Sequence, residues 1–187
     1  MDSKNQLIEL LQFKPKNHLI PRLITGIESQ QVVDFQSDLN LLKGVWELRW
    51  SSSTQPRLKQ AFWLENLQVL DPEQQRGVNL LRLSGPLGSL AMIAVEAKLS
   101  VNSSNQIGVQ FERGGWLGPS LPNRWRPKLQ TKINQAFPAW LDITFIDETL
   151  RICRGNAGTC FALLKRDDLE VTDWIPTSSK NHMSSLK

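Results

Sequence analysis

The strongest constraint on the fold is an alternation of apolar and polar residues that begins at Gly44 and continues to Lys165. It comes in short runs separated by Gly, Pro, Asn and Asp, a pattern that predicts β-strands with one buried face. About eight such strands, joined antiparallel, close into a barrel wide enough for one small ligand. We therefore expect a mainly β fold, an antiparallel β-barrel, although a β-sandwich has the same pattern. The predicted strands span residues 45–52, 61–70, 77–84, 90–101, 107–113, 140–146, 150–154 and 159–165.

Residues before this alternation show helical spacing of apolar side chains instead. Ser3 and Gln6 form a capping box at the start of a first helix, and Pro15 separates it from a second. Pro21 is compatible with the first turn of that second helix. The domain organisation that we predict is a helical segment packed on the barrel (1–43), the barrel (44–168) and a flexible polar tail (169–187).

The segment 114–138 interrupts the strands and contains four prolines, so it cannot form one long strand. A short amphipathic helix is expected after Pro127. The segment also carries basic residues without nearby acids, which indicates either a membrane-surface contact or a solvated loop over one end of the barrel. The net charge of +4 and the lack of a recognised motif argue against a nucleic-acid partner. The candidate membrane-surface residues are Arg124, Trp125, Arg126, Lys128 and Lys132.

Two tight turns near the C-terminus predict a register for the last strands. Turns at 147–148 and 155–158 place Phe145 opposite Leu150, and Ile152 opposite Phe161. Side chains on one face of these strands are then apolar, and we expect that face to be the interior. Its members are Leu141, Ile143, Phe145, Leu150, Ile152, Phe161 and Leu163.

The same register assigns the polar residues of these strands. Arg151 would lie on the outer face, diagonal to Asp142, where an ion pair is expected to form. Cys153 and Cys160 would face each other on that outer face as free thiols, since two cysteines without a secretory signal indicate a reducing compartment. Arg154 would point inward, where a guanidinium needs a carboxylate, a carbonyl or an aromatic ring as partner.

Two runs of residues resemble a known family. Residues 140–161, WLDITFIDETLRICRGNAGTCF, and residues 41–48, LLKGVWEL, are similar to the C-terminal and N-terminal signatures of PAP/fibrillin (plastid lipid-associated) proteins. With the order and spacing between them, the resemblance covers most of residues 1–166. Phe145, Trp50 and Cys153 depart from the residues common in the family, which are Tyr, Tyr and Ser. The absence of a visible transit peptide favours a cyanobacterial-type member.

The resemblance implies a lipocalin-like barrel in which a Trp closes one end beneath an Arg from a late strand. Trp46 and Arg154 are the residues expected in these roles. It also implies non-catalytic binding of an apolar small molecule, namely a prenyl-quinone, a carotenoid or an acyl lipid. The expected location is the cytoplasmic face of the thylakoid membrane, as a peripheral protein. The candidate ligand-binding residues are Trp46, Leu48, Trp50, Phe62, Leu64, Phe111, Ile143, Phe145 and Phe161.

The sequence provides little for catalysis. The only histidines are His18 and His182, and the common catalytic and nucleotide-binding motifs are missing, so we expect no catalytic site, no metal and no cofactor. Two alternatives stay open. The barrel could be filled, with its outer surface recruiting a protein of the photosynthetic apparatus, or the protein could be a lipocalin-like bilin lyase.

Overall fold

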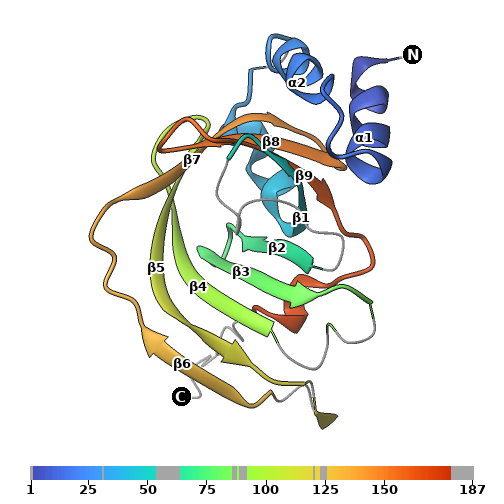
Figure 1. Ribbon diagram of the computed structural model, residues 1–187. Helices are drawn as coiled ribbons and strands as arrows, with labels where there is room; N and C mark the ends of the chain where they lie inside the picture. Colours follow the sequence, from blue (N-terminus) through green and yellow to red (C-terminus); the bar gives the residue numbers. More distant parts are fainter. Residues whose placement is uncertain are drawn as a thin grey trace, which may run out of the picture.

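The computed structural model describes residues 2–30, 32–53, 64–85, 88, 92–119, 121–122 and 126–177. Nine antiparallel strands form one sheet, and eight of them close into a ring in the order β1, β2, β3, β4, β5, β7, β8, β9 and back to β1 (Figure 1). Each of the eight predicted runs overlaps one ring strand, so the mainly β antiparallel fold is confirmed. The strands are β1 Gly44–Ser51, β2 Leu64–Asp71, β3 Arg76–Leu83, β4 Met92–Val101, β5 Gln106–Leu117, β6 Lys128–Lys132, β7 Ala139–Ile146, β8 Leu150–Gly155 and β9 Cys160–Lys165.

The ninth strand replaces the helix predicted after Pro127. β6 pairs with the second half of β5 and lies outside the ring (Figure 1). Gly115 permits this pairing, because a Cβ at that position would lie 2.0 Å from the carbonyl oxygen of Leu129. The free edge of β5 offers backbone hydrogen bonds that outweigh the weak helical periodicity of the segment.

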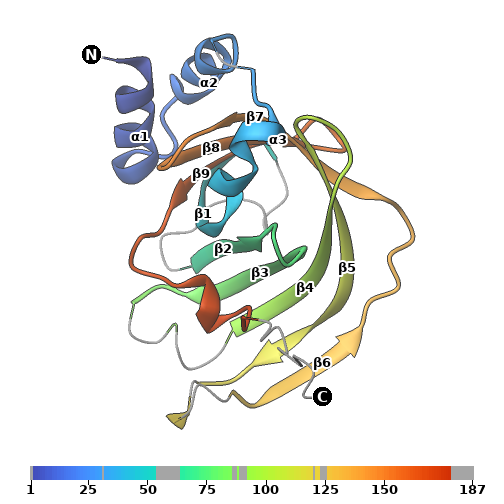
Figure 2. The ribbon, with the colours of Figure 1, turned by 180° about the vertical axis from the view of Figure 1, so that it is seen from behind.

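Two helices, α1 Ser3–Phe13 and α2 Ile20–Glu28, form an antiparallel pair over the outer face of β7, β8 and β9 (Figures 1 and 2). Both were predicted, but Asp2 rather than Ser3 caps α1, since its carboxylate accepts from the Lys4 N–H. Their apolar faces make one cluster with the sheet. Its fully buried members include Leu7, Leu11, Ile20, Leu150, Ile152 and Ala162.

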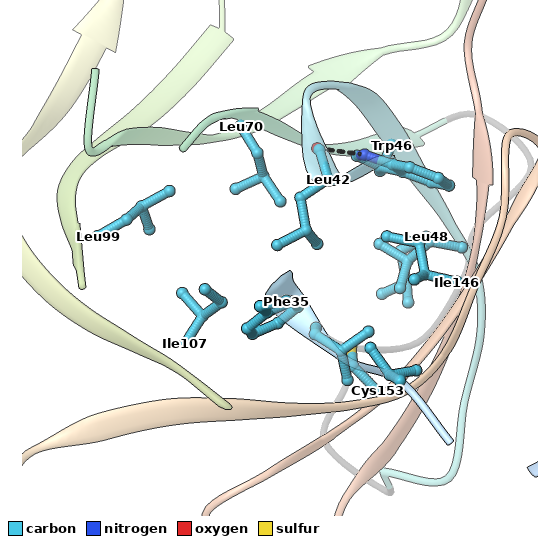
Figure 3. Packing of buried hydrophobic residues seen from close by; sticks show 12 residues of the cluster. Phe35, Leu42, Trp46, Leu48, Leu70, Leu99, Ile107, Ile146 and Cys153 are labelled. Atoms are coloured by element: carbon cyan, nitrogen blue, oxygen red, sulfur yellow. Dashed lines mark hydrogen bonds between the residues drawn. The ribbon is translucent and has the colours of Figure 1, made fainter. Parts of the chain in front are cut away.

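A second pair of short helical turns closes one end of the ring. α3 Phe35–Asp38 and η1 Leu39–Leu42 lie within the ring in Figure 2 and lead directly into β1. The Phe35 N–H donates to the carbonyl oxygen of Ser104 in the β4–β5 turn, at 2.7 Å. Figure 3 shows Phe35 and Leu42 pointing toward the same interior as Leu70, Leu99 and Ile107.

The loops of the C-terminal hairpins differ from the predicted turns. Asp147 Oδ1 accepts from the N–H groups of Thr149 and Leu150, and this shifts the first hairpin so that Phe145 pairs with Ile152. In the second hairpin the Gly155 N–H donates to Thr159. Gly158 adopts a φ of +71° there, in a loop of three residues. Ile152 therefore pairs with Ala162, and the predicted register was wrong.

This slip exchanges the faces of β8, because neighbouring residues of a strand point to opposite sides. Leu150 and Ile152 pack against the helices, whereas Arg151 and Cys153 face the interior. The expected ion pair between Asp142 and Arg151 is absent from the described residues. Asp142 accepts instead from Gln106 Nε2, at 2.7 Å.

Two β-bulges change the face on which aromatic side chains lie. The register shifts between Leu48 and Trp50 in β1, and between Ile143 and Phe145 in β7. An extra residue at each bulge leaves Leu48 and Ile143 in the interior cluster and turns Trp50 and Phe145 toward the helices. The interior positions predicted for Trp50 and Phe145 were therefore wrong.

The described part of the predicted tail packs on the ring. Residues 169–175, which include η5 Val171–Asp173, cover the outer face of β2, β3 and β4, and Ile175 is buried among Leu67, Val69 and Leu80. The sequence predicted a flexible tail from residue 169, and this was wrong for the part that the structure describes. The segment is mostly polar, so its composition did not reveal that a few apolar side chains pack it against the ring.

Candidate functional site

The ring encloses a cavity of about 380 Å³. This lies in the range of small-molecule sites, which is roughly 300–1,000 Å³. Ile93 lines the cavity and its side chain is 54% exposed, so the cavity reaches solvent beside β4. The wall is largely apolar and comes from most of the ring strands. Its apolar members include Leu48, Leu70, Val95, Leu99, Ile107, Phe111, Ile143 and Phe161.

Trp46 closes the end of the ring nearest η1. Its side chain is fully buried, and its Nε1–H donates to the carbonyl oxygen of Leu42 at 2.9 Å (Figure 3). The guanidinium carbon of Arg151 lies 5.1 Å from the centre of the Trp46 ring, which is the geometry of a cation–π contact. A Trp beneath an Arg of a late strand is therefore present, but the Arg is Arg151.

Arg154, which was expected in that role, lies on the opposite face of β8. Its Nε and Nη2 donate to the two carboxylate oxygens of Glu28 in α2, at 3.0 and 2.6 Å. The Thr144 hydroxyl donates to the same carboxylate at 2.7 Å. The hydrogen bond to Glu28 raises the pKa of Arg154 above its usual value. Arg154 thus fastens α2 to the ring, and the predicted pairing with Trp46 was wrong because the register slipped by one residue.

Arg151 is the most unusual polar residue of the cavity wall. It is fully buried, and its Nη2 donates a short hydrogen bond to Gln68 Oε1. Its Nε and Nη1 have no hydrogen-bond partner, and burial lowers the pKa of the guanidinium. No carboxylate within the described ranges forms an ion pair with it. Two further amides, those of Asn66 and Asn79, line the same cavity.

Only some of the other predicted ligand-binding residues line the cavity. Leu48, Phe111, Ile143 and Phe161 line the cavity together. Leu64 begins β2 and is half-buried, but it is not a lining residue. Phe62 lies outside the described residues. Sequence reasoning missed Gln68, Asn79 and Arg151, although the alternation of β2 and β3 places the first two on the interior face.

Comparison with known proteins identifies the family to which this chain belongs. Residues 10–164 match the family model described as PAP_fibrillin. The chain belongs to the PAP_fibrillin family. Relatives include a chromoplast-specific carotenoid-associated protein of Cucumis sativus, 27% identical over 78% of this chain and 59% of its own length. A probable plastid-lipid-associated protein 2 of Arabidopsis thaliana is 26% identical over 76% of this chain and 61% of its own length. A light-induced chloroplastic protein of Solanum tuberosum is 26% identical over 78% of this chain and 59% of its own length.

This PAP_fibrillin chain spans about three fifths of the length of those curated relatives. The two quoted signatures, LLKGVWEL and WLDITFIDETLRICRGNAGTCF, fall within the matched region, and the resemblance to PAP/fibrillin proteins is confirmed. Both signatures contribute to the closed end of the ring. The first supplies the last two residues of η1 and Trp46, and the second supplies Arg151.

The basic segment of this family member is only partly described. Arg124 and Trp125 lie outside the described residues. Arg126 is half-buried, with its guanidinium 4.8 Å from the ring centre of Trp174, so it packs against the C-terminal segment. Lys128 and Lys132 are exposed on β6. Leu129 is 76% exposed on the same edge strand, with its side chain on the face opposite that of the two lysines.

The two thiols do not face each other as predicted. Cys153 is buried in the interior cluster and Cys160 in the cluster beneath the helices, on opposite faces of the sheet. Both are free, and burial raises the pKa of Cys153 and that of Cys160, the latter to about 12. The prediction of surface thiols was wrong because the same one-residue register shift that moved Arg154 also changed the positions of the cysteines.

The described residues contain neither a metal-binding cluster nor a membrane-spanning helix. No group of three or more His, Cys, Asp or Glu side chains in them is arranged to hold a metal ion. None of the described helices has the length and apolar character needed to span a bilayer.

Proposed function

We propose that this PAP_fibrillin protein binds an apolar small molecule, without catalysis, in the cavity of a lipocalin-like barrel. Prenyl-quinones, carotenoids and acyl lipids are the ligand classes that we consider. The observation that carries the proposal is the solvent-accessible cavity of about 380 Å³ with its largely apolar wall. The printed names of the relatives, which are associated with carotenoid and with plastid lipid, support the same class of ligand.

The energetics are adequate for reversible binding. Burial of roughly 400 Å² of apolar ligand surface at about 25 cal/mol per Å² contributes on the order of 10 kcal/mol. Association costs several kcal/mol of this in lost translational and rotational freedom. Affinities near the micromolar range follow, which suit a carrier that takes up and releases its ligand.

The rival hypothesis, a filled ring that serves only to recruit another protein, requires an interior without space for a guest. The cavity beside Leu48, Phe111 and Phe161 therefore favours the carrier. Recruitment of a photosynthetic protein by the outer surface is compatible with a carrier, but no observation on the described surface favours it.

Mass spectrometry after organic extraction tests the carrier directly. The full chain, purified from a photosynthetic host, should release one apolar molecule per protein. Ala97 lines the cavity and is 4% exposed, so Ala97→Trp would fill the interior and should release much less. Ala157→Trp, in an exposed hairpin loop, adds the same side chain outside the cavity and should behave as wild type. Equal ligand content in both variants would contradict the proposal.

We further propose that β6 contacts a membrane surface, on the cytoplasmic face of thylakoids in a cyanobacterial-type member. Lys128, Leu129 and Lys132 combine exposed cations with an exposed apolar side chain, a combination that favours the interface of anionic lipid. Phe137, between β6 and β7, is also exposed, at 80%.

Vesicle flotation tests the membrane contact. The variant Lys128→Ser/Leu129→Ser/Lys132→Ser should bind anionic vesicles several-fold less than wild type. Lys14→Ser/Lys16→Ser, on the exposed loop between α1 and α2, is the control for loss of two positive charges. If the two variants lose binding equally, the effect is one of net charge and β6 has no special role.

A further inference from the structure

Arg151 carries a buried positive charge that no carboxylate of the described residues neutralises. Its side chain is fully buried, yet only Nη2 has a hydrogen-bond partner, the neutral amide of Gln68. A guanidinium has five N–H donors, and those on Nε and Nη1 are unused. Buried charges without a counter-ion are rare because the loss of hydration is costly.

The contact with Trp46 supplies neither a counter-ion nor a hydrogen-bond acceptor for Arg151. A ring face attracts the cation, but it does not accept the in-plane N–H groups of Nε and Nη1. A second cation, Lys165 Nζ, lies 5.4 Å from the centre of the same Trp46 ring. Two cations therefore lie against the Trp46 ring, and of the two Arg151 lines the cavity, where it would stabilise an anion.

The position of Arg151 relates this charge to the cavity. Arg151 and Gln68 both line the cavity at the end closed by Trp46 and Leu42. Around the exposed Ile93 the wall is mostly apolar: Leu81 pairs with Ile93, and the neutral amide of Asn66 is next in that row. The cavity thus has a cationic inner end and an apolar path to the outside, the polarity of a site for an amphiphile inserted head first.

We propose that Arg151 binds the carboxylate of a long-chain carboxylic acid whose hydrocarbon chain occupies the cavity. The inference rests on the proposed carrier function and narrows its ligand class to acyl compounds with a free acid group. A carboxylate is the acceptor that balances one guanidinium charge and takes several of its hydrogen bonds. The neutral amides of Asn66 and Asn79 lie along the same wall and can hydrogen-bond a head group without adding charge.

The test compares oleate with oleyl alcohol, which has the same chain and a neutral head group. Delipidated full-length protein is titrated with each at pH 8 and below micelle-forming concentrations, and Trp fluorescence is followed. Oleate should bind at least about tenfold more tightly than the alcohol, the scale of a charge-assisted hydrogen bond.

Three variants show whether Arg151 causes the preference. Gln68→Glu keeps the shape of the wall and supplies Arg151 with an internal counter-ion, so the preference for oleate should disappear while alcohol affinity stays within about threefold. Arg151→Met should also lose the preference. Gln110→Glu adds the same negative charge at an exposed position of β5 that does not line the cavity, and it should keep the preference.

The possible results separate the two proposals. Equal affinity of wild type for oleate and oleyl alcohol would overturn the role of Arg151 and leave the carrier function standing. Failure of both ligands to bind would overturn the head-group site and the acyl ligand class, and if organic extraction also released no apolar molecule, the carrier function would be overturned with them. A folded Gln68→Glu variant that still prefers oleate would overturn the head-group site alone, and this result does not depend on Arg151→Met folding.

Discussion

Glu28 is the residue that joins the helical pair to the ring. Its carboxylate accepts hydrogen bonds from Arg154 and Thr144 and is largely shielded from solvent, with its side chain 13% exposed. Charge-assisted hydrogen bonds in such surroundings are stronger than exposed ion pairs. Arg154 therefore has a structural role at the helix–sheet contact.

Replacement of Glu28 tests this role. Glu28→Gln removes the charge and one acceptor oxygen, and we expect the free energy of unfolding to fall by about 1–2 kcal/mol in urea denaturation. Glu73→Gln is the matched control, because Glu73 pairs with Lys43 at the exposed surface and should change stability by less than about 0.5 kcal/mol. Equal effects of the two substitutions would show that the Glu28–Arg154 pair stabilises the fold no more than the exposed Glu73–Lys43 pair does.

Cys160 predicts a dependence of stability on pH. Burial raises its pKa from 9.0 to about 12, so above pH 9 the unfolded chain releases this proton while the folded chain retains it. The stabilisation is thus complete below pH 9 and is lost as the pH rises from there toward 12. Relative to Cys160→Ala, wild type should lose about 1 kcal/mol of unfolding free energy between pH 8 and 10. A difference between the two proteins that stays constant with pH would contradict the burial of the thiol.

At the scale of elements, the apolar face of α1 decides how firmly the helical pair is held. Leu11 is fully buried against the sheet, whereas Phe13 in the same helix is 75% exposed. Leu11→Ala should lower the free energy of unfolding by about 2–5 kcal/mol, because it leaves a cavity in the core. Phe13→Ala should lower it by less than about 0.5 kcal/mol, because that side chain is already exposed. Calorimetry of both variants would check this, and similar melting temperatures would show that α1 is not docked as described.

The sequence allowed the elements to be predicted better than their faces. The alternation from Gly44 located all eight ring strands, since it reports directly on which residues are buried. Loop length is not encoded in that alternation. The three-residue loop ending at Gly158 moved Arg151 inward and Arg154 outward, and no periodicity in β8 distinguishes the two cases.

The candidate site was predictable to the same extent. Leu48, Phe111, Ile143 and Phe161 lie in the cavity wall as alternation placed them. Trp50 and Phe145 do not, because each follows a β-bulge, and a bulge depends on the partner strand rather than on its own sequence. β6 was missed for a related reason, as its pairing depends on the free edge of β5.

At the scale of the whole molecule, the described residues form three apolar clusters, and each of them lies against the ring. One fills its closed end, one lies under α1 and α2, and one lies under residues 169–175. The cluster at the closed end continues into the apolar wall of the cavity, which encloses space that no described side chain fills. Occupation of the cavity should therefore complete the core and stabilise the folded state as a whole.

This coupling makes the melting temperature a measure of ligand binding. A ligand that binds only the folded state at one hundred times its Kd adds about 2.7 kcal/mol of stability, which for a chain of this length corresponds to a rise of about 5–10 °C. Protein stripped of lipid should melt lower than the protein as purified, and added oleate should restore the difference. Ala97→Trp, whose ring occupies the cavity, should melt at one temperature with or without oleate. If stripped and reloaded wild type melt together while oleate still binds, oleate binds the folded and the unfolded chain equally well, and it does not occupy a cavity that only the folded chain has.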